Sequence, residues 1–180
     1  MDSETPAAPK PELDADTLAF AGRVFQYARL GHAEELAELF GQGLPANLRN
    51  DKGDSLLMLA AYNGQAEAAR VILEGGGDPE LANDRGQTPL AGAAFKGDLA
   101  IAGLLLAHGA QVDGTGTGTR TALMTAAMFN RTDMVELLLA HGADPDLRDG
   151  AGLTAAEMAQ SMGAADTPRQ LAQAKRPGAG

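Results

Sequence analysis

Residues 83–115 read NDRGQTPLAGAAFKGDLAIAGLLLAHGAQVDGT, and the segments on either side can be laid over this stretch without an insertion. Two sets of marker residues recur at a constant spacing of 33: Gly53, Gly86, Thr119 and Gly152 form the first set, and Ser55, Thr88, Thr121 and Thr154 form the second. A fixed period of this size is typical of a solenoid, in which each unit buries its apolar side against its neighbours. The sequence therefore predicts a repetitive binding scaffold.

Each unit carries the signals for two short antiparallel helices. Thr88 suits a helix N-cap and Pro89 suits the first helical position, where its missing N–H costs nothing. Gly97 ends this helix, and Asp98 then opens a second helix whose leucines recur at helical spacing. Residues 110–120 are rich in Gly, Thr and Asp and have no helical period, so we expect an extended loop or hairpin to lead to the next unit.

The run GQTPL, the Ala-Ala pair that follows it and the Leu-rich segment closing with LLAHGA resemble the ankyrin repeat. The resemblance covers about four fifths of the chain, and it is specific because several markers share one spacing. It implies an all-α solenoid of helix-turn-helix units joined by β-hairpin-like loops, with a degenerate capping repeat at each end. It also implies a protein-binding module without catalysis.

The register divides the chain into one repeat domain between two tails. We expect a disordered, acidic, Pro-rich tail over residues 1–15, a single ankyrin-repeat domain over 16–174 and a disordered tail over 175–180. Asp16 or Thr17 is the expected N-cap of the first helix. The units are a cap at 16–49, full repeats at 50–82, 83–115 and 116–148, and a second cap at 149–174.

The chain departs from the family pattern directly after the T-P-L motif. Family members usually carry a histidine there, which bonds locally and fixes the turn into the first helix. The equivalent residues here are Met58, Ala91 and Met124. We expect lower local stability or compensation by methionine packing, and not a loss of the fold.

Composition narrows the possible partners. The formal net charge of −10 disfavours nucleic acids and anionic membranes, because proteins bind both through clustered Lys and Arg. The chain has no cysteine, so it cannot form a disulfide or a cysteine-based metal site. The acidic N-terminal segment has no apolar run, and no stretch approaches the length of a membrane span, so we expect a cytoplasmic protein without a secretory signal.

Loop tips and the last residues of each first helix are the positions that stacking leaves free. By resemblance they form a concave, partner-binding surface. Its candidate residues are Lys52, Asp54, Tyr62 and Asn63 in the first full repeat, Arg85, Gln87, Phe95 and Lys96 in the second, and Arg120, Met128 and Phe129 in the third. Further variable positions are Asp51, Asp84, Thr117 and Gly118.

An aromatic and methionine stripe is expected on this surface. Tyr62, Phe95 and Met128 are spaced by 33, so repeats stacked about 10 Å apart would align them, with Phe129 beside the row. These side chains either anchor a partner or pack beneath the neighbouring hairpin. In the first case we expect the charged side chains of Arg85, Lys96 and Arg120 to set the partner's orientation.

Other candidate sites are weaker. His108 and His141 lie one repeat apart without a third ligand, so we expect structural hydrogen bonds between hairpins and no metal ion. The Gly-Thr run at 114–119 lacks the Lys-Ser/Thr of a phosphate loop and is expected to form a flexible hairpin tip. No nucleophile motif or convergent acid–base pair is present, so we expect no catalytic residue and no cofactor.

The predicted function is recognition of a partner protein by a preformed, monomeric surface, as an adaptor or regulator. Two alternatives stay open: a self-associating structural protein that dimerises through the same stripe, and an inhibitor that occludes the active site of a partner enzyme. The compact, Ala/Gly-rich form also resembles bacterial ankyrin proteins, some of which accompany peroxide-defence enzymes. This likeness suggests a role in stress defence.

Overall fold

Ten α-helices follow one another in the computed structural model, which describes residues 14–174. Among these residues there is no strand, and the only β-type pairing is an isolated antiparallel bridge between Arg49 and Ser55. No described helix has both the length and the apolar character needed to cross a membrane. The helices are α1 (Ala15–Leu30), α2 (Ala33–Gly41), α3 (Leu56–Tyr62), α4 (Ala66–Glu74), α5 (Pro89–Lys96), α6 (Leu99–Ala107), α7 (Ala122–Met128), α8 (Thr132–Ala140), α9 (Ala155–Ser161) and α10 (Thr167–Ala174).

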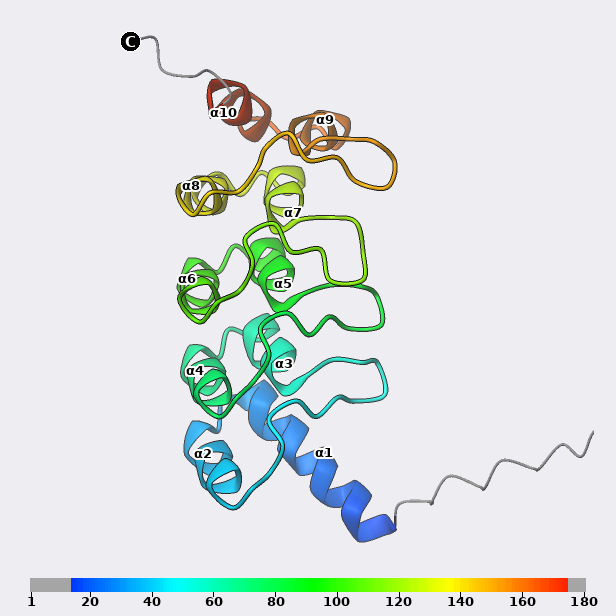
Figure 1. Cartoon of the computed structure of the whole chain (residues 1–180), viewed down its shortest axis with the longest axis vertical. Coiled ribbons are helices and arrows are strands. Elements are labelled where there is room, and N and C mark those ends of the chain that lie inside the picture. The colour runs from blue at the N-terminus through cyan, green and yellow to red at the C-terminus, as the bar shows by residue number, and fades with distance from the viewer. Residues whose placement is uncertain (1–13, 175–180) are drawn as a thin grey trace, which may run out of the picture.

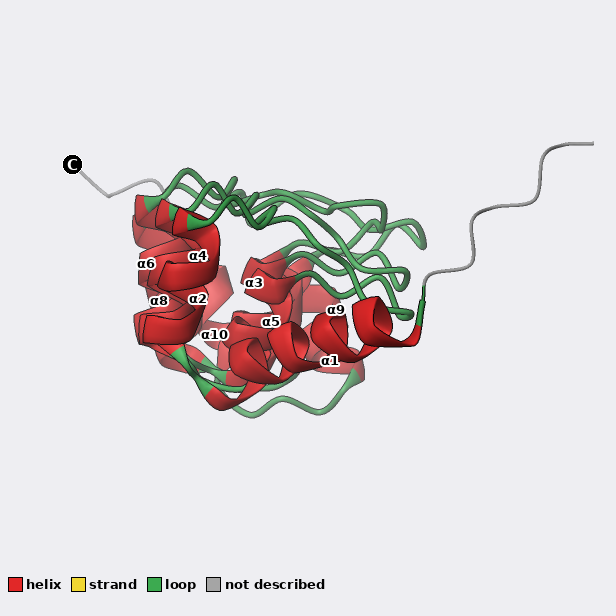
Figure 2. Ribbon diagram, turned by 90° about the horizontal axis from the view of Figure 1, so that it is seen from below, coloured by secondary structure: helices red, strands yellow, loops and turns green. Residues whose placement is uncertain are grey.

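The helices form two parallel columns, with the connecting loops on one side (Figures 1 and 2). The inner column contains α1, α3, α5, α7 and α9, and each of these helices packs against the next. The outer column contains α2, α4, α6, α8 and α10, and each outer helix packs against the inner helix of its own unit. The predicted all-α solenoid of helix pairs is confirmed, and long loops project from the inner column beside the helices (Figure 1).

Buried hydroxyl groups fix the start of each inner helix. Ser55, Thr88, Thr121 and Thr154 are at most 4% exposed, and each side-chain oxygen accepts the backbone N–H three residues later at 3.0–3.3 Å. This hydrogen bond satisfies a donor that the first turn of a helix leaves free. The 33-residue spacing of the hydroxyls therefore sets the spacing of the inner helices.

The core combines small and large side chains in the same register. The alanine pairs at 60–61, 93–94 and 126–127 are fully buried in α3, α5 and α7, where they let neighbouring inner helices approach closely. Ile72, Leu105 and Leu138 are fully buried at equivalent positions of the outer helices. Each unit thus buries its apolar side against its own partner helix and the adjacent units.

Two methionines fill the positions at which a histidine was expected from the family. Met58 and Met124 are 4% and 1% exposed. The sulfur of Met124 also accepts the backbone N–H of Thr121 at 3.5 Å, and so completes a capping box at the start of α7. The structure therefore shows packing of these methionines at the turn into the inner helix.

The first helix begins earlier than the sequence suggested. Asp14 is the N-cap of α1, and its carboxylate accepts the backbone N–H of Thr17 at 2.8 Å and the Thr17 hydroxyl at 2.9 Å. The prediction of Asp16 or Thr17 as the cap is wrong, because both lie within the first turn whose free donors Asp14 satisfies. Tails were predicted at 1–15 and 175–180; residues 1–13 and 175–180 lie outside the described residues, whereas Asp14 and Ala15 belong to the start of α1.

Candidate functional site

Three of the four loop tips are each built around one Asn or Asp side chain. The Oδ1 atom of Asn50 accepts the backbone N–H groups of Lys52 and Asp54, both at 2.9 Å. Asn83 and Asp149, at equivalent positions, make the same pair of bonds in the second and fourth hairpins. These bonds hold each tip in a tight turn with its outer residues pointing away from the turn.

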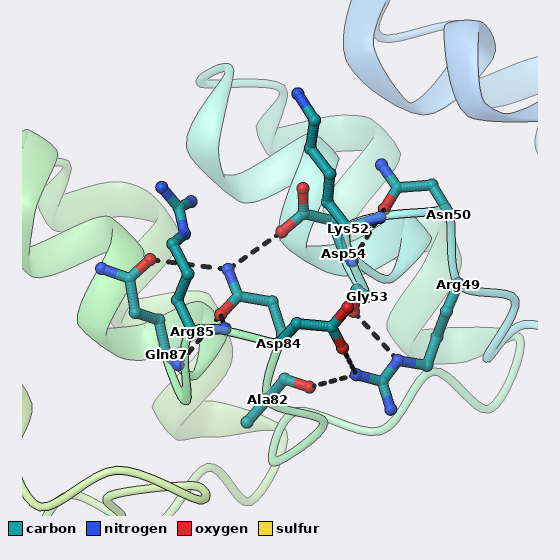
Figure 3. Close-up of polar contacts among 10 residues, drawn as sticks. Arg49, Asn50, Lys52, Gly53, Asp54, Ala82, Asp84, Arg85 and Gln87 are labelled. Atoms are coloured by element: carbon teal, nitrogen blue, oxygen red, sulfur yellow. Dashed lines mark hydrogen bonds and ion pairs between the residues drawn. The ribbon is translucent and has the colours of Figure 1, made fainter.

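Polar contacts tie the first hairpin to the second (Figure 3). The Asn83 amide donates to the carboxylate of Asp54 at 2.9 Å. Arg49 donates to the carbonyl oxygens of Gly53 and Ala82, each at 2.9 Å, and its guanidinium lies 3.3 Å from the Asp84 carboxylate. The tips therefore form a connected edge along the stack.

The second and third hairpins meet through glycines. A Cβ atom on Gly86 would lie 2.8 Å from the backbone nitrogen of Gly118, and one on Gly118 would lie 3.1 Å from the carbonyl oxygen of Gly86. A side chain at Gly86 would therefore force one of the two backbones to move. This close approach accounts for glycine at positions 86 and 118, and Gly116, with positive φ, stands where the other hairpins carry an Asx residue.

A groove runs along the stack between the hairpin tips and the inner helices. It consists of two hollows of about 590 and 620 Å³ that share Arg85 and Gln87. The first hollow lies over α3 and the second over α5 and α7. Nine of the predicted site residues line this groove: Lys52, Asp54, Tyr62, Arg85, Gln87, Phe95, Arg120, Met128 and Phe129.

Three rings form an aromatic row at the helix end of the groove. The rings of Tyr62 and Phe95 are stacked, with centroids 6.2 Å apart and planes 5° apart. Phe95 meets Phe129 edge-on at 4.8 Å. Tyr62 is 40% exposed and Phe129 41% exposed, whereas Met128 is partly buried against the core. The row therefore continues through Phe129, and not through Met128 as the 33-residue spacing suggested.

Asn63 and Lys96 lie apart from the groove. They border a separate hollow of about 700 Å³, with Gly64, Gly97 and Leu99, where the inner helices turn into the outer ones. The Asn63 amide donates to the carbonyl oxygen of Leu59 at 2.7 Å, and the Lys96 ammonium lies 4.7 Å from the centre of the Tyr62 ring. Lys96 therefore lies against the end of the aromatic row, whereas the Asn63 amide bonds within its own helix.

Several residues of the groove floor were not among those predicted from the sequence. Met58 and Gly92 line the first hollow, and Thr125 and the backbone around Gly150 line the second. Gly92 could have been noticed, because Leu59 and Thr125 stand 33 residues before and after it. The contribution of Gly150 depends on how the fourth hairpin folds over the third repeat, which the sequence does not encode locally.

The histidines do not bridge hairpins. The Nδ1 atoms of His108 and His141 lie 2.9 and 2.8 Å from the carbonyl oxygens of Leu104 and Leu137, in the helix that each histidine follows. The prediction of bonds between hairpins is wrong, because the ring reaches back over its own last turn. Over residues 14–174, no three His, Cys, Asp or Glu side chains are grouped as metal ligands.

Comparisons with known proteins agree with this architecture. A family model described as ankyrin repeats (3 copies) matches residues 24–116, and a second, described as ankyrin repeats (many copies), matches residues 105–159. A Pseudomonas aeruginosa protein named as an ankyrin repeat protein is 53% identical over 64 residues, which cover 36% of this chain and 37% of the relative. The match thus spans little more than a third of that protein's length.

The ankyrin repeat is generally a non-enzymatic domain for protein–protein interaction. The first of the two family matches alone covers more than half of the chain. The matched residues contain the helix pairs, buried capping hydroxyls and projecting hairpins that the 33-residue register sets out. The chain is therefore a member of the ankyrin-repeat family.

Proposed function

We propose that this protein binds a partner protein in the groove between its hairpin tips and the inner helices α3, α5 and α7, without catalysis. The observation that carries the proposal is that the groove extends over adjacent repeats as two adjoining hollows. Its two hollows share Arg85 and Gln87, and its floor ends at the aromatic row of Tyr62, Phe95 and Phe129.

The aromatic row has the character of an interaction anchor. Tyr62 and Phe129 keep about two fifths of their surface exposed, although aromatic surface is costly to leave in water. Charged side chains at Lys52, Arg85 and Arg120 surround the row, and half-exposed aromatics ringed by charge are typical of binding hot spots. A partner that covers the row would remove this surface from water.

The hairpin tips are held in place before any partner arrives. Asn83 and Arg49 bind the first tip to the second, and the Asx-type bonds fix each of these turns. A preformed surface loses little conformational entropy on binding, so more of the contact energy appears as affinity. This rigidity suits an adaptor or a regulator that recognises one surface repeatedly.

Three more specific expectations go beyond binding of a partner protein. Inhibition of a partner enzyme, a cytoplasmic location and a link to stress defence stay predictions from the sequence. The Pseudomonas aeruginosa relative supports a bacterial setting.

Affinity purification with matched variants tests the groove. Wild type is compared with Tyr62→Glu/Phe129→Glu and with Glu136→Gln, a control on the exposed side of α8, after circular dichroism confirms that all three fold. We expect a partner that wild type and Glu136→Gln retain and the groove variant loses. A partner retained by the groove variant would contradict the proposal. A wild-type dimer that the groove variant abolishes, measured by sedimentation, would support self-association instead.

A further inference from the structure

The groove differs in charge from the rest of the chain. Over the full sequence, 24 acidic residues stand against 14 Lys and Arg. The groove is lined by three basic residues, Lys52, Arg85 and Arg120, and three acidic ones, Asp54, Asp84 and Asp149. Its formal charge is therefore zero on a protein whose net charge is −10.

The acidic side chains of the groove already have partners within the protein. Asp54 accepts the Asn83 amide at 2.9 Å, and Asp84 pairs with Arg49 at 3.3 Å. The Asp149 side chain is only 6% exposed, and it accepts two backbone N–H groups of its own hairpin. The Asp54 and Asp149 carboxylates hold the hairpins together and are poorly available to a ligand. Asp84 keeps 64% of its side chain exposed, and the Arg49 guanidinium beside it offsets its charge.

The basic side chains of the groove have unused donors. Lys52 and Arg85 are exposed, and neither side chain makes a hydrogen bond or ion pair with any residue of 14–174. Both extend away from the bonded network between the first two tips (Figure 3). Arg120 is 59% exposed and reaches Asp149 only at 3.9 Å, which leaves most of its five N–H donors free.

The floor of the first hollow contains a notch at Gly92, in α5. The equivalent residues of the neighbouring repeats are Leu59 and Thr125, which both carry larger side chains. A Cβ atom on Gly92 would lie 3.5 Å from the Met58 sulfur and 3.8 Å from the Tyr62 ring, which are ordinary contact distances. Packing therefore does not require glycine here, although glycine weakens a helix. Because Gly92 has no side chain, the groove is deeper at this position, beside Met58 and Tyr62.

We propose that the groove takes an extended, acidic segment of the partner, with carboxylates on Lys52 and Arg85 and one apolar side chain in the notch at Gly92. This inference rests on the proposed function and names the chemistry of its ligand. Carboxylates bind Lys and Arg through charge-assisted hydrogen bonds, and the notch between Met58 and Tyr62 removes an apolar group from water.

The repeat spacing sets the spacing of the acidic residues in the ligand. Lys52 and Arg85 occupy equivalent positions of adjacent repeats, whose packed helices lie about 8–10 Å apart. A polyproline-type segment advances about 3.1 Å per residue and returns to the same face every third residue, so it covers about 9 Å in one turn. Two Asp or Glu residues three positions apart therefore match the two cations.

A displayed library of random peptides, selected against the full chain, tests the inference. We expect enrichment of peptides with Asp or Glu three residues apart around an apolar residue. The best peptide should bind Lys52→Gln/Arg85→Gln at least ~10-fold more weakly, because two charge-assisted bonds are lost. Arg23→Gln/Arg169→Gln removes the same charge at exposed positions outside the groove, and should change the affinity less than about twofold.

The outcomes separate the ligand chemistry from the site. Peptides rich in Lys or Arg, or equal weakening by both charge variants, would overturn the acidic ligand. If Tyr62→Glu/Phe129→Glu still abolished their binding, the groove would stand as the site. No enrichment would overturn the extended acidic ligand alone. Enriched peptides whose binding resists both the aromatic and the charge variants of the groove would overturn the ligand and the proposed function together.

Discussion

At the scale of single residues, side chains that cross from one repeat to the next hold the loops in place. Asn83 is the clearest case, because it is 3% exposed and serves two hairpins at once. Its oxygen accepts the backbone N–H groups of Arg85 and Gln87, both at 3.1 Å, while its amide donates to Asp54. One side chain therefore shapes its own tip and links it to the preceding one.

Replacing Asn83 by Ala should lower the free energy of unfolding by about 1–3 kcal/mol, because it leaves two backbone donors and the Asp54 carboxylate without their partner. Urea denaturation measures the change. Asn83→Asp is the matched control, since Asp149 makes the same two backbone bonds in the fourth hairpin. It should lose less stability than Asn83→Ala, and equal stability of wild type and Asn83→Ala would contradict this role.

On the side of the loops away from the groove, three equivalent side chains each accept a backbone N–H from the next repeat. Asn47 accepts from Asp78 at 2.8 Å, Glu80 from Gln111 at 2.8 Å, and Asp113 from Asp144 at 3.1 Å. Partial burial raises the pKa of the Asp113 carboxyl above its usual value, and the charge of Asp144 adds to this effect. The ionised form of Asp113 is therefore disfavoured in the folded protein.

Asp113→Asn should raise stability at neutral pH, because Asn47 shows that an uncharged amide oxygen can accept the same bond. A raised carboxyl pKa makes the folded state of wild type relatively most stable below the unfolded pKa of about 3.9, with that stability lost as pH rises through the folded value. The gain in melting temperature should thus shrink as pH falls towards 4. A gain independent of pH would show that the Asp113 charge is not its cause.

At the scale of the helices, the sequence predicted most of the fold because its signals are local. The capping hydroxyl at Thr88, Pro89 at the first helical position and Gly97 with positive φ act within one turn of the helix end that they define. Asp14 was missed as the cap of α1 because Asp16 and Thr17 offer the same chemistry two and three residues later. Where several nearby residues could cap a helix, the tertiary position of the helix determines which of them does.

The groove was harder to predict than the helices, because its lining comes from side chains of different repeats. Met128 shares the register of Tyr62 and Phe95, yet Phe129 makes the ring contact with Phe95. α7 ends at Met128, so the following residue, in the cap position, faces the neighbouring ring. Asn63 and Lys96 occupy the same register position as Phe129, yet they border the separate hollow at the turn into the outer helix, so register alone does not decide which side a residue of this position faces.

Gly92→Ala should show that the groove floor is not optimised for stability. The Cβ fits at ordinary contact distances in α5, so the variant should gain about 0.5–1 kcal/mol in free energy of unfolding from helix propensity. It should also bind the groove ligand more weakly, because the methyl group fills the notch. Chemical denaturation and a peptide titration measure the two effects. A loss of stability would mean that Gly92 is needed for packing.

At the scale of the whole molecule, the stability of each repeat depends on its contacts with the repeats beside it in the stack. Helix α6 packs against α4, α5 and α8, whereas α10 closes the end against α7, α8 and α9. Gln170 in α10 donates to the carbonyl oxygen of Thr132, and the Thr167 hydroxyl donates to that of Ala127. The polar end helix thus closes the column on the last full repeat, as a terminal cap must.

Two leucine truncations should therefore act differently. Leu105 and Leu171 are both fully buried, and each Leu→Ala change should cost about 2–5 kcal/mol locally. Leu105→Ala, in the middle of the stack, should raise amide hydrogen exchange across all repeats. Leu171→Ala should raise exchange mainly in α9 and α10, since an end unit has neighbours on one side only. The same exchange pattern in both variants would contradict the view that the stability of a repeat depends on its neighbours in the stack.

The groove as the binding surface is tested most directly by hydrogen exchange of the full chain with and without its bound partner. We predict slower exchange at the tips around 51–54, 84–87 and 117–120 and at the C-terminal ends of α3, α5 and α7, with α4, α6 and α8 unchanged. Slower exchange confined to those outer helices, with the tips unaffected, would contradict the account.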